Sequence, residues 1–148
     1  MFDSDFVLER RLGVSVREYF EAQGEPAFRE AEQQVLNELT EESRGVLSTG
    51  GGVVLKPGNR ENLHARTCSV YLHCAPDELF KRLRRDRTRP LLQVADPLEK
   101  LKELYATRDP LYREVAHLVV QTGAQSIPSL VDLIVTELER LGSSSPSR

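Results

Sequence analysis

The sequence lacks several features that would assign it at once to a familiar class. It contains no Gly-Lys-Ser or Gly-Lys-Thr triplet, so the GxxxxGK[ST] loop that binds nucleotide phosphates is absent from these 148 residues. No apolar run approaches the roughly 18 residues of a membrane span, and the start shows no basic-then-apolar signal segment. The net charge of -3 argues against a general nucleic-acid binder. We therefore expect a cytoplasmic protein without membrane or nucleic-acid partners.

Cysteine is scarce as well. Cys68 and Cys74 flank a strand-like run, in which side-chain alternation would place both on one face of a sheet about 20 Å apart. That separation is too large for a disulfide between them. We predict two buried thiols and no metal or redox role.

The composition fits one ordinary domain. With 39% hydrophobic and 29% charged residues, the chain has enough apolar material for a single core. We expect this domain to cover residues 1–141, with a disordered tail at 142–148, where the sequence reads GSSSPSR.

Helix and strand patterns alternate along the chain. Helices are predicted at GVSVREYFEAQG, from Pro26 through Leu39, at PGNRENLHA, from Pro76, after Asp96, and from Leu130 to Leu141. Pro110 is expected to end or kink the helix that follows Asp96. Strands are predicted at GVLST, CSVYLHC and HLVVQT, and FDSDF resembles the end of another. This alternation predicts an α/β fold, a parallel sheet with helices on both faces.

Carboxylates and glycines occupy the expected carboxyl edge of the sheet. Asp3 and Asp5 lie two residues apart at a strand end, so both could face a ligand, bind Mg²⁺ or accept a proton. The alternative is that they cap the next helix, Asp5 in particular. The run Gly50–Gly52 could present backbone N–H groups to an oxygen-rich ligand, or form a flexible turn.

The arginines also have two interpretations each. Arg29 could pair with Glu25 or Glu32 along its helix, or grip a carboxylate in a cleft. Arg108 could grip a carboxylate too, or favour a helix end electrostatically. The basic run from Lys81 to Arg89 could be a solvated face, but RPLL places Arg89 on a proline-stiffened loop that suggests a lid. No role is assigned to the histidines, His64, His73 and His117, because they share no ligand spacing.

Five segments, in this order and at these separations, resemble the shikimate kinase family of nucleoside-monophosphate-kinase-like P-loop proteins. They are DSD, GEPAFREAE, STGGGVV, RPLL and RDPLY, and the resemblance extends from Asp3 to about Leu141. It implies transfer of the γ-phosphoryl group of ATP, with Mg²⁺, to the 3-hydroxyl of shikimate on the pathway to chorismate and the aromatic amino acids.

The resemblance also implies roles for individual residues. Acceptor binding would fall to Asp5, Arg29, Gly51, Gly52 and Arg108, and Asp5 would also take the proton. Asp3 would lie near the metal. The nucleotide would contact Arg82, Arg89 and Gln125, and Arg89 would stabilise charge on the transferring phosphoryl group as a lid arginine.

The family begins with a strand, a GxxxxGK[ST] loop and a helix, about 30 residues that this sequence does not contain. We therefore expect a shikimate kinase that is incomplete at its N-terminus, without the central first strand of its sheet, inactive in this length and monomeric once completed. One alternative is a non-catalytic relative that binds a small carboxylate or a protein partner. Nucleic-acid binding by the basic run is another, and gluconate is an alternative acceptor.

Overall fold

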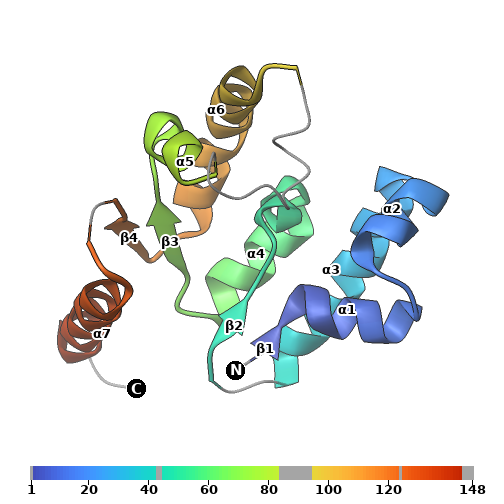
Figure 1. Cartoon of the computed structure of the whole chain (residues 1–148). Helices are drawn as coiled ribbons and strands as arrows, with labels where there is room; N and C mark the ends of the chain where they lie inside the picture. Colours follow the sequence, from blue (N-terminus) through green and yellow to red (C-terminus); the bar gives the residue numbers. More distant parts are fainter. Residues whose placement is uncertain (1, 43–44, 84–94, 124, 145–148) are drawn as a thin grey trace. The chain divides into compact units, whose positions relative to one another are not determined.

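The computed structural model describes residues 2–42, 45–83, 95–123 and 125–144 (Figure 1). The chain divides into two compact units, Met1–Cys68 and Ser69–Arg148. No helix within the described ranges is both long and apolar enough to cross a membrane.

The first unit contains a parallel pair of short strands and mostly helices. Its elements are β1 (Phe2–Asp3), α1 (Ser4–Leu12), α2 (Val16–Gln23), α3 (Glu25–Glu42), β2 (Leu47–Ser48), the 3₁₀ helix η1 (Gly51–Leu55) and α4 (Pro57–Arg66). β1 and β2 run parallel, with Asp3 opposite Ser48. Both strands therefore end at the same edge of the sheet. Helix α1 and the run Gly50–Gly52, called the glycine segment below, begin at this edge.

Local signals set the boundaries of α1 and α2. The Asp3 carboxylate accepts hydrogen bonds from the backbone N–H of Asp5 at 2.9 Å and of Phe6 at 3.3 Å, so Asp3 is the N-cap of α1. Ser15 Oγ accepts from the N–H of Glu18 at 3.0 Å, which confirms the predicted start of α2. α2 ends at Gly24, as predicted, and the φ of +85° there suits glycine.

The core of the first unit lies between α3 and the two helices before it (Figure 1). Its fully buried members are Leu8 of α1 and Phe28 and Val35 of α3. The apolar residues packed around them are Val7, Leu12, Val16, Tyr19, Ala31 and Leu39. The helical spacing of apolar residues predicted for α3 is confirmed, because Phe28, Ala31, Val35 and Leu39 all face this core.

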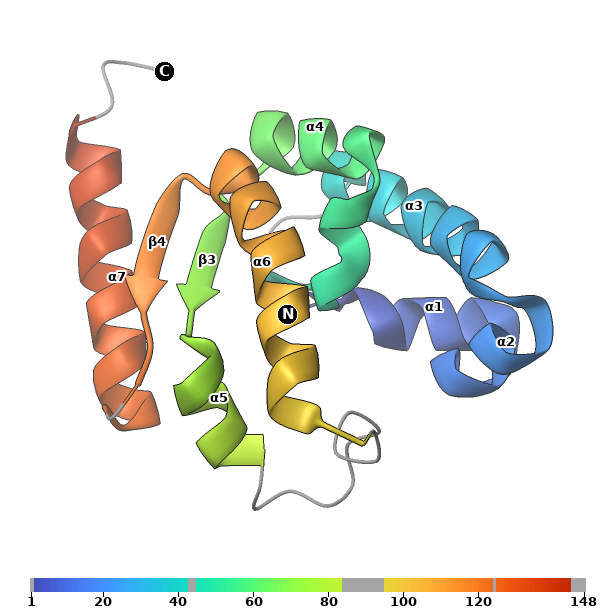
Figure 2. The ribbon, with the colours of Figure 1, turned by 90° about the horizontal axis from the view of Figure 1, so that it is seen from above.

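The second unit contains the other parallel pair. Its elements are β3 (Val70–His73), α5 (Pro76–Leu83), α6 (Pro97–Val115), β4 (Leu118–Gln121) and α7 (Ile127–Ser144). β3 and β4 lie side by side and run in the same direction, with His73 opposite Gln121 (Figure 2). The prediction of an α/β fold with parallel strands is confirmed within each unit. α7 continues past Leu141 into the segment expected to form the tail, and residues 145–148 lie outside the described residues.

Two local predictions in and beside this unit are wrong. Pro110 was expected to end or kink its helix near Arg108, and the end is wrong, because the helix continues through Pro110 to Val115. The Asp109 side chain, next to that proline, is held by Tyr71 of β3, and such tertiary contacts can offset the hydrogen bond that a proline removes. The thiol of Cys68 is exposed, because β3 begins only at Val70, whereas Cys74 is half-buried.

Candidate functional site

Asp5 lies at the carboxyl edge of the β1–β2 pair, with its carboxylate against the glycine segment. The interpretation of Asp5 as the helix cap is wrong, because Asp3 fills that position. A Cβ added to Gly50 would lie 3.2 Å from Asp5 Oδ2, so the Gly50 backbone passes directly beside this carboxylate. The Asp5 side chain is therefore left for a role other than capping.

The surroundings of Asp5 make it a stronger base than an ordinary aspartate. Burial raises the pKa of the Asp5 carboxyl, and the negative charges of Asp3 and Glu9 raise it further, while Arg29 opposes the shift. A carboxylate with a raised pKa is better suited to accept a proton from a hydroxyl group.

The raised pKa of Asp5 predicts that Asp5→Asn stabilises the fold. The folded chain loses stability as pH rises through the raised pKa of Asp5, because the ionised carboxylate is less favourable in the folded chain than in the unfolded chain. Asparagine does not ionise, so the variant avoids this loss. The gain in unfolding free energy over the parent chain should therefore grow as pH rises above 3.8, the ordinary pKa of aspartate, in chemical denaturation. Asp77→Asn, at an exposed first-turn position of α5, should show no such gain. A loss of stability in Asp5→Asn at neutral pH would contradict the prediction.

Arg29 is a nearly buried cation in a fixed position. Its side chain is 13% exposed, its Nη1 donates to Glu32 Oε1 at 2.8 Å, and Glu25 lies 3.5 Å from Nη2. The guanidinium also lies over the ring of Phe28. The predicted pairing with Glu25 and Glu32 along the helix is thus confirmed. Its Nε is buried without a hydrogen-bond partner among the described residues.

The same guanidinium packs against the glycine segment. A Cβ added to Gly52 would collide with both terminal nitrogens of Arg29, so this contact requires glycine. The two interpretations of Arg29 are therefore compatible: it pairs with Glu32 within α3 and also borders the carboxyl edge of the strands. The arrangement brings a raised-pKa carboxylate, a fixed guanidinium and a glycine backbone into one part of the first unit.

The glycine segment forms the start of a 3₁₀ helix and not a flexible turn. Its first hydrogen bond runs from the N–H of Val53 to the carbonyl of Gly50, at 3.4 Å. Gly52 is buried together with Val53 and Val54. Such a segment can present backbone donors close to Asp5 and Arg29.

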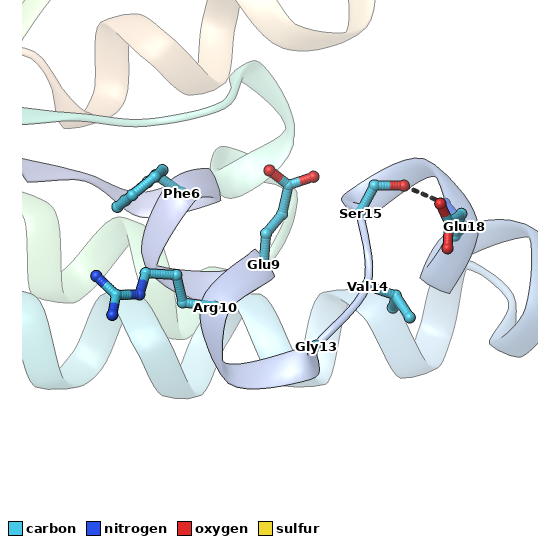
Figure 3. Close-up of a pocket in the computed structure, with 7 residues that line it drawn as sticks. All are labelled: Phe6, Glu9, Arg10, Gly13, Val14, Ser15 and Glu18. Carbon is cyan, nitrogen blue, oxygen red and sulfur yellow. Dashed lines mark hydrogen bonds between the residues drawn. The ribbon is translucent and has the colours of Figure 1, made fainter.

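A hollow on the surface of the first unit is lined by other residues. Figure 3 shows its lining from α1 and α2: Phe6, Glu9, Arg10, Gly13, Val14, Ser15 and Glu18. Its polar groups serve the start of α2, since Glu9 Oε2 accepts from the N–H of Val16 at 2.7 Å and Ser15 accepts from Glu18. Because Asp5, Arg29 and the glycines do not line it, we do not assign the functional site to this hollow.

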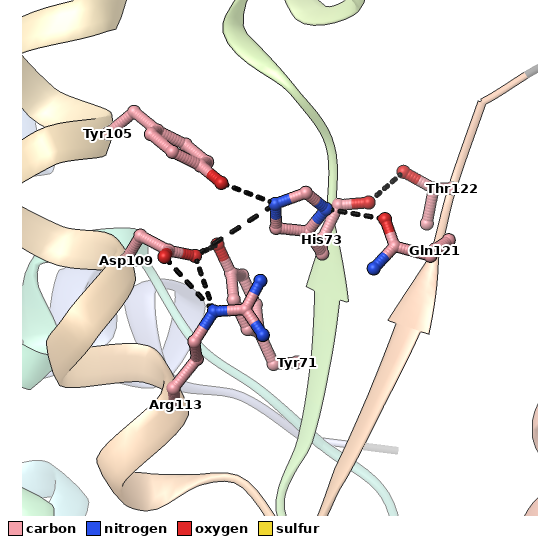
Figure 4. A network of polar contacts seen from close by, with 7 residues as sticks. All are labelled: Tyr71, His73, Tyr105, Asp109, Arg113, Gln121 and Thr122. Atoms are coloured by element: carbon pink, nitrogen blue, oxygen red, sulfur yellow. Dashed lines mark hydrogen bonds and ion pairs between the residues drawn. The ribbon is translucent and has the colours of Figure 1, made fainter.

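A polar network, which the sequence did not reveal, joins β3, β4 and α6 in the second unit (Figure 4). His73 Nδ1 lies 2.6 Å from Gln121 Oε1, and His73 Nε2 lies 2.7 Å from the hydroxyl of Tyr105. Since the amide oxygen only accepts, Nδ1 carries the proton and Nε2 accepts from Tyr105 when the ring is neutral. His73, which the sequence left without a role, thus joins the two strands to α6.

Asp109 completes this network. It accepts from the hydroxyl of Tyr71 at 2.7 Å and from Arg113 Nε at 3.0 Å. Burial by itself would raise the pKa of Asp109, but these two hydrogen bonds, together with the charges of Arg113 and His73, outweigh it and the pKa is lowered. Burial and the neighbouring carboxylate raise the pKa of the Tyr71 hydroxyl. Two sequence signals could have indicated this network. Tyr71 and His73 alternate onto one face of β3, and Asp109 and Arg113 form an i,i+4 pair in α6.

The remaining predicted residues belong to the second unit. Arg108 is half-buried in α6, next to Asp109. Arg82 donates to the carbonyl of Gly123, and Gln125 Nε2 donates to the carbonyl of Gln121 at 2.8 Å, so both gather at the segment after β4. Arg89 lies outside the described residues.

Comparisons with known proteins agree with one another. The family model described as shikimate kinase matches residues 1–139. A shikimate kinase of Paracidovorax citrulli is 49% identical over 98% of this chain and 81% of its own length. One of Burkholderia thailandensis is 48% identical over 95% of this chain and 77% of its own length.

Solved structures show the same similarity. Shikimate kinase from Acinetobacter baumannii in complex with shikimate superposes with a TM-score of 0.85 at 42% identity, covering 99% of this chain and 80% of that one. Shikimate kinase from Aquifex aeolicus gives a TM-score of 0.78 at 28% identity, with coverage of 97% and 83%.

Proposed function

Because the chain belongs to the shikimate kinase family, we propose that its first unit binds shikimate for phosphorylation of the 3-hydroxyl by ATP. The observation that carries this proposal is the placement of Asp5 and Arg29 on the glycine segment. A carboxylate that accepts protons readily and a fixed guanidinium are the two groups that an acceptor with hydroxyls and a carboxylate requires.

Arg29 would bind the shikimate carboxylate. A guanidinium can donate two parallel hydrogen bonds to a carboxylate, and its planar fork fixes the orientation of the partner. Glu32 and Phe28 hold this fork in place before the acceptor arrives, which reduces the ordering cost of binding. Arg108 is proposed as a further carboxylate-binding cation, on the basis of its match to the RDPLY segment of the family.

Asp5 would orient the acceptor hydroxyl and take its proton as the oxygen attacks the γ-phosphoryl group. Its raised pKa supports this role, because the proton then moves to a better base. The N–H groups of Gly51 and Gly52 would donate to acceptor oxygens from the neighbouring backbone. Positioning of the acceptor hydroxyl and removal of its proton would thus both depend on residues of the first unit.

The nucleotide and metal residues are proposed from the family match. Arg82 and Gln125 would contact ATP, a role that their shared position around Gly123 supports. Arg89 would stabilise charge on the transferring phosphoryl group. Members of the family use ATP with a metal ion, which we propose is Mg²⁺, near Asp3. A single carboxylate fits this ion, because Mg²⁺ is bound mainly by phosphates, waters and one or two carboxylates. Mg²⁺ would neutralise charge on the phosphates.

The proposed setting is a monomer in the cytoplasm. ATP is available in that compartment, and Asp5, Arg29 and the glycine segment come from one unit of one chain, so no second copy is needed to bring them together.

ADP release by the 148-residue chain with Mg·ATP, measured with and without shikimate, tests the proposed function. Because these 148 residues contain no GxxxxGK[ST] loop, we expect no turnover from this chain alone. Once the strand, loop and helix of a family member are joined to its N-terminus, we expect release that depends on shikimate and stops when the metal is chelated. Equal rates with and without shikimate in that completed chain would contradict the proposal, and stimulation by gluconate in place of shikimate would contradict the acceptor.

A further inference from the structure

We propose that Asn59, assisted by Arg60, is a positioning residue for the acceptor site: its buried side-chain amide fixes η1 so that Gly52 supports the guanidinium of Arg29. This inference rests on the proposed function, because it assigns Asn59 a role in binding the same acceptor.

The fold places both side chains beside the end of η1. Pro57 occupies the first position of α4, and the N–H groups of Asn59 and Arg60 both donate to the carbonyl of Lys56, at 3.1 and 3.2 Å. Side chains in a helix point back toward its N-terminus, and those of the first turn therefore extend over the segment that precedes the helix. Here that segment is η1, which ends at Leu55.

The side chains of Asn59 and Arg60 donate hydrogen bonds to two adjacent backbone carbonyls of η1. Asn59 Nδ2 donates to the carbonyl of Val53 at 3.0 Å, and Arg60 Nη1 donates to the carbonyl of Val54 at 2.7 Å. The last backbone carbonyls of a short helix have no hydrogen-bond donor within the helix. Side-chain donors from a neighbouring segment can therefore fix the position of the helix end. Asn59 and Arg60 thus fix η1 from its carboxyl end.

The other end of η1 borders the functional groups. Gly52, one residue before Val53, packs against the Arg29 guanidinium, and Gly50 packs against the Asp5 carboxylate. The guanidinium is therefore held between Glu32 on its own helix and the backbone of η1. Any displacement of η1 would move the surface on which Arg29 rests, and a misplacement of about 1 Å can cost two orders of magnitude in function.

The burial and hydrogen bonding of Asn59 indicate that its Nδ2 donor is the part of the side chain that fixes η1. The residue is fully buried, its exposed fraction being 0%, yet Oδ1 has no hydrogen-bond partner among the described residues. Buried polar atoms normally have partners, so an amide with an unpartnered oxygen is an unfavourable choice for packing alone. Its Nδ2 bond to Val53 gives the side chain a specific task.

Substitution at two asparagines of α4 tests the inference. Asn59→Leu removes the donor at similar volume. Asn62→Leu is the matched control, because Asn62 Nδ2 donates to Asn37 Oδ1 at 3.2 Å and not to η1. In calorimetric titration, we expect Asn59→Leu to weaken shikimate binding about 10-fold or more, and Asn62→Leu to stay within about twofold of the parent chain.

A readout without ligand separates this inference from the proposed function. In NMR spectra of the free chain, the Gly52 amide and the Arg29 Nε resonances should shift in Asn59→Leu and not in Asn62→Leu. If the parent chain does not bind shikimate, the proposed function is wrong. The resonances of the free variants would still test whether Asn59 positions Gly52 and Arg29. Resonances or affinities that are the same in both variants would overturn the inference.

A second variant covers the case in which Asn59→Leu does not fold. Arg60→Met keeps the aliphatic stem but loses the bond to Val54, and should weaken shikimate binding about threefold and shift the same two resonances. Binding and resonances equal to those of the parent chain in Arg60→Met, with Asn59→Leu unfolded, would overturn the proposal.

Discussion

Arg29→Ala is expected to weaken shikimate binding by about 100-fold or more, which corresponds to about 2.7 kcal/mol or more. The variant loses the guanidinium that would form two charge-assisted hydrogen bonds with the acceptor carboxylate. Calorimetric titration of the purified chain measures the effect. Arg29→Lys keeps the charge but loses the planar fork, so it should fall between the parent chain and Arg29→Ala.

A control must separate binding from folding, because Arg29→Ala removes the cation that forms an ion pair with the 3% exposed Glu32. Removing one member of a buried ion pair typically costs about 3–5 kcal/mol of stability, whereas apolar replacement of both members is often neutral. The double variant Arg29→Met with Glu32→Leu should therefore recover stability but not shikimate binding. Arg17→Ala, which breaks an exposed pair with Glu21 in α2, should change neither. A double variant that binds shikimate like the parent chain would refute the role of Arg29.

In the chain completed with the family's N-terminal strand, GxxxxGK[ST] loop and helix, Asp5→Asn is expected to lower turnover by about 10²- to 10⁴-fold, the usual contribution of a positioned general base. Shikimate affinity should change much less, because asparagine keeps the shape and still hydrogen-bonds a hydroxyl. Steady-state ADP formation gives kcat, and calorimetry gives the affinity. Asp77→Asn is the matched control, since Asp77 also lies in the first turn of a helix but outside the first unit.

The pH dependence gives an independent check on Asp5. Because the pKa of Asp5 is raised, turnover should fall as pH is lowered through a value above that of an ordinary aspartate. Glu9→Gln removes one of the charges that raise the pKa, so this acid limb should move to lower pH. An unchanged kcat in Asp5→Asn, or an acid limb that persists in that variant, would show that another group accepts the proton.

Sequence patterns predicted the local features of the fold well. Ser15, Gly24, Pro76 and Asp96 mark helix boundaries through contacts within a few residues, and the structure has boundaries at each of them. A helix end at Pro110 was one of the two predicted outcomes, and it is wrong because a contact beside the proline, from Asp109 to Tyr71, joins segments far apart in the chain. Local rules therefore identified the elements but could not weigh tertiary contacts against them.

The candidate site was predictable in its residues but not in its geometry. Asp3 and Asp5 could both serve as a cap, and only the observed end of β1 decides that Asp3 does. The spacing around Arg29 indicated its glutamate partners, whereas its contact with Gly52 arises from the folding of α3 against η1. Asn59 carries no motif of its own, because its importance lies in a bond to a backbone carbonyl.

The most direct test of an acceptor site in the first unit is an NMR titration of the 148-residue chain with shikimate. Binding at this site predicts that the largest amide shifts occur at Asp5, Arg29, Gly51 and Gly52, with small shifts in the hollow around Val14 and Ser15. Largest shifts in that hollow, or no shifts at millimolar shikimate, would contradict the assignment of the acceptor site.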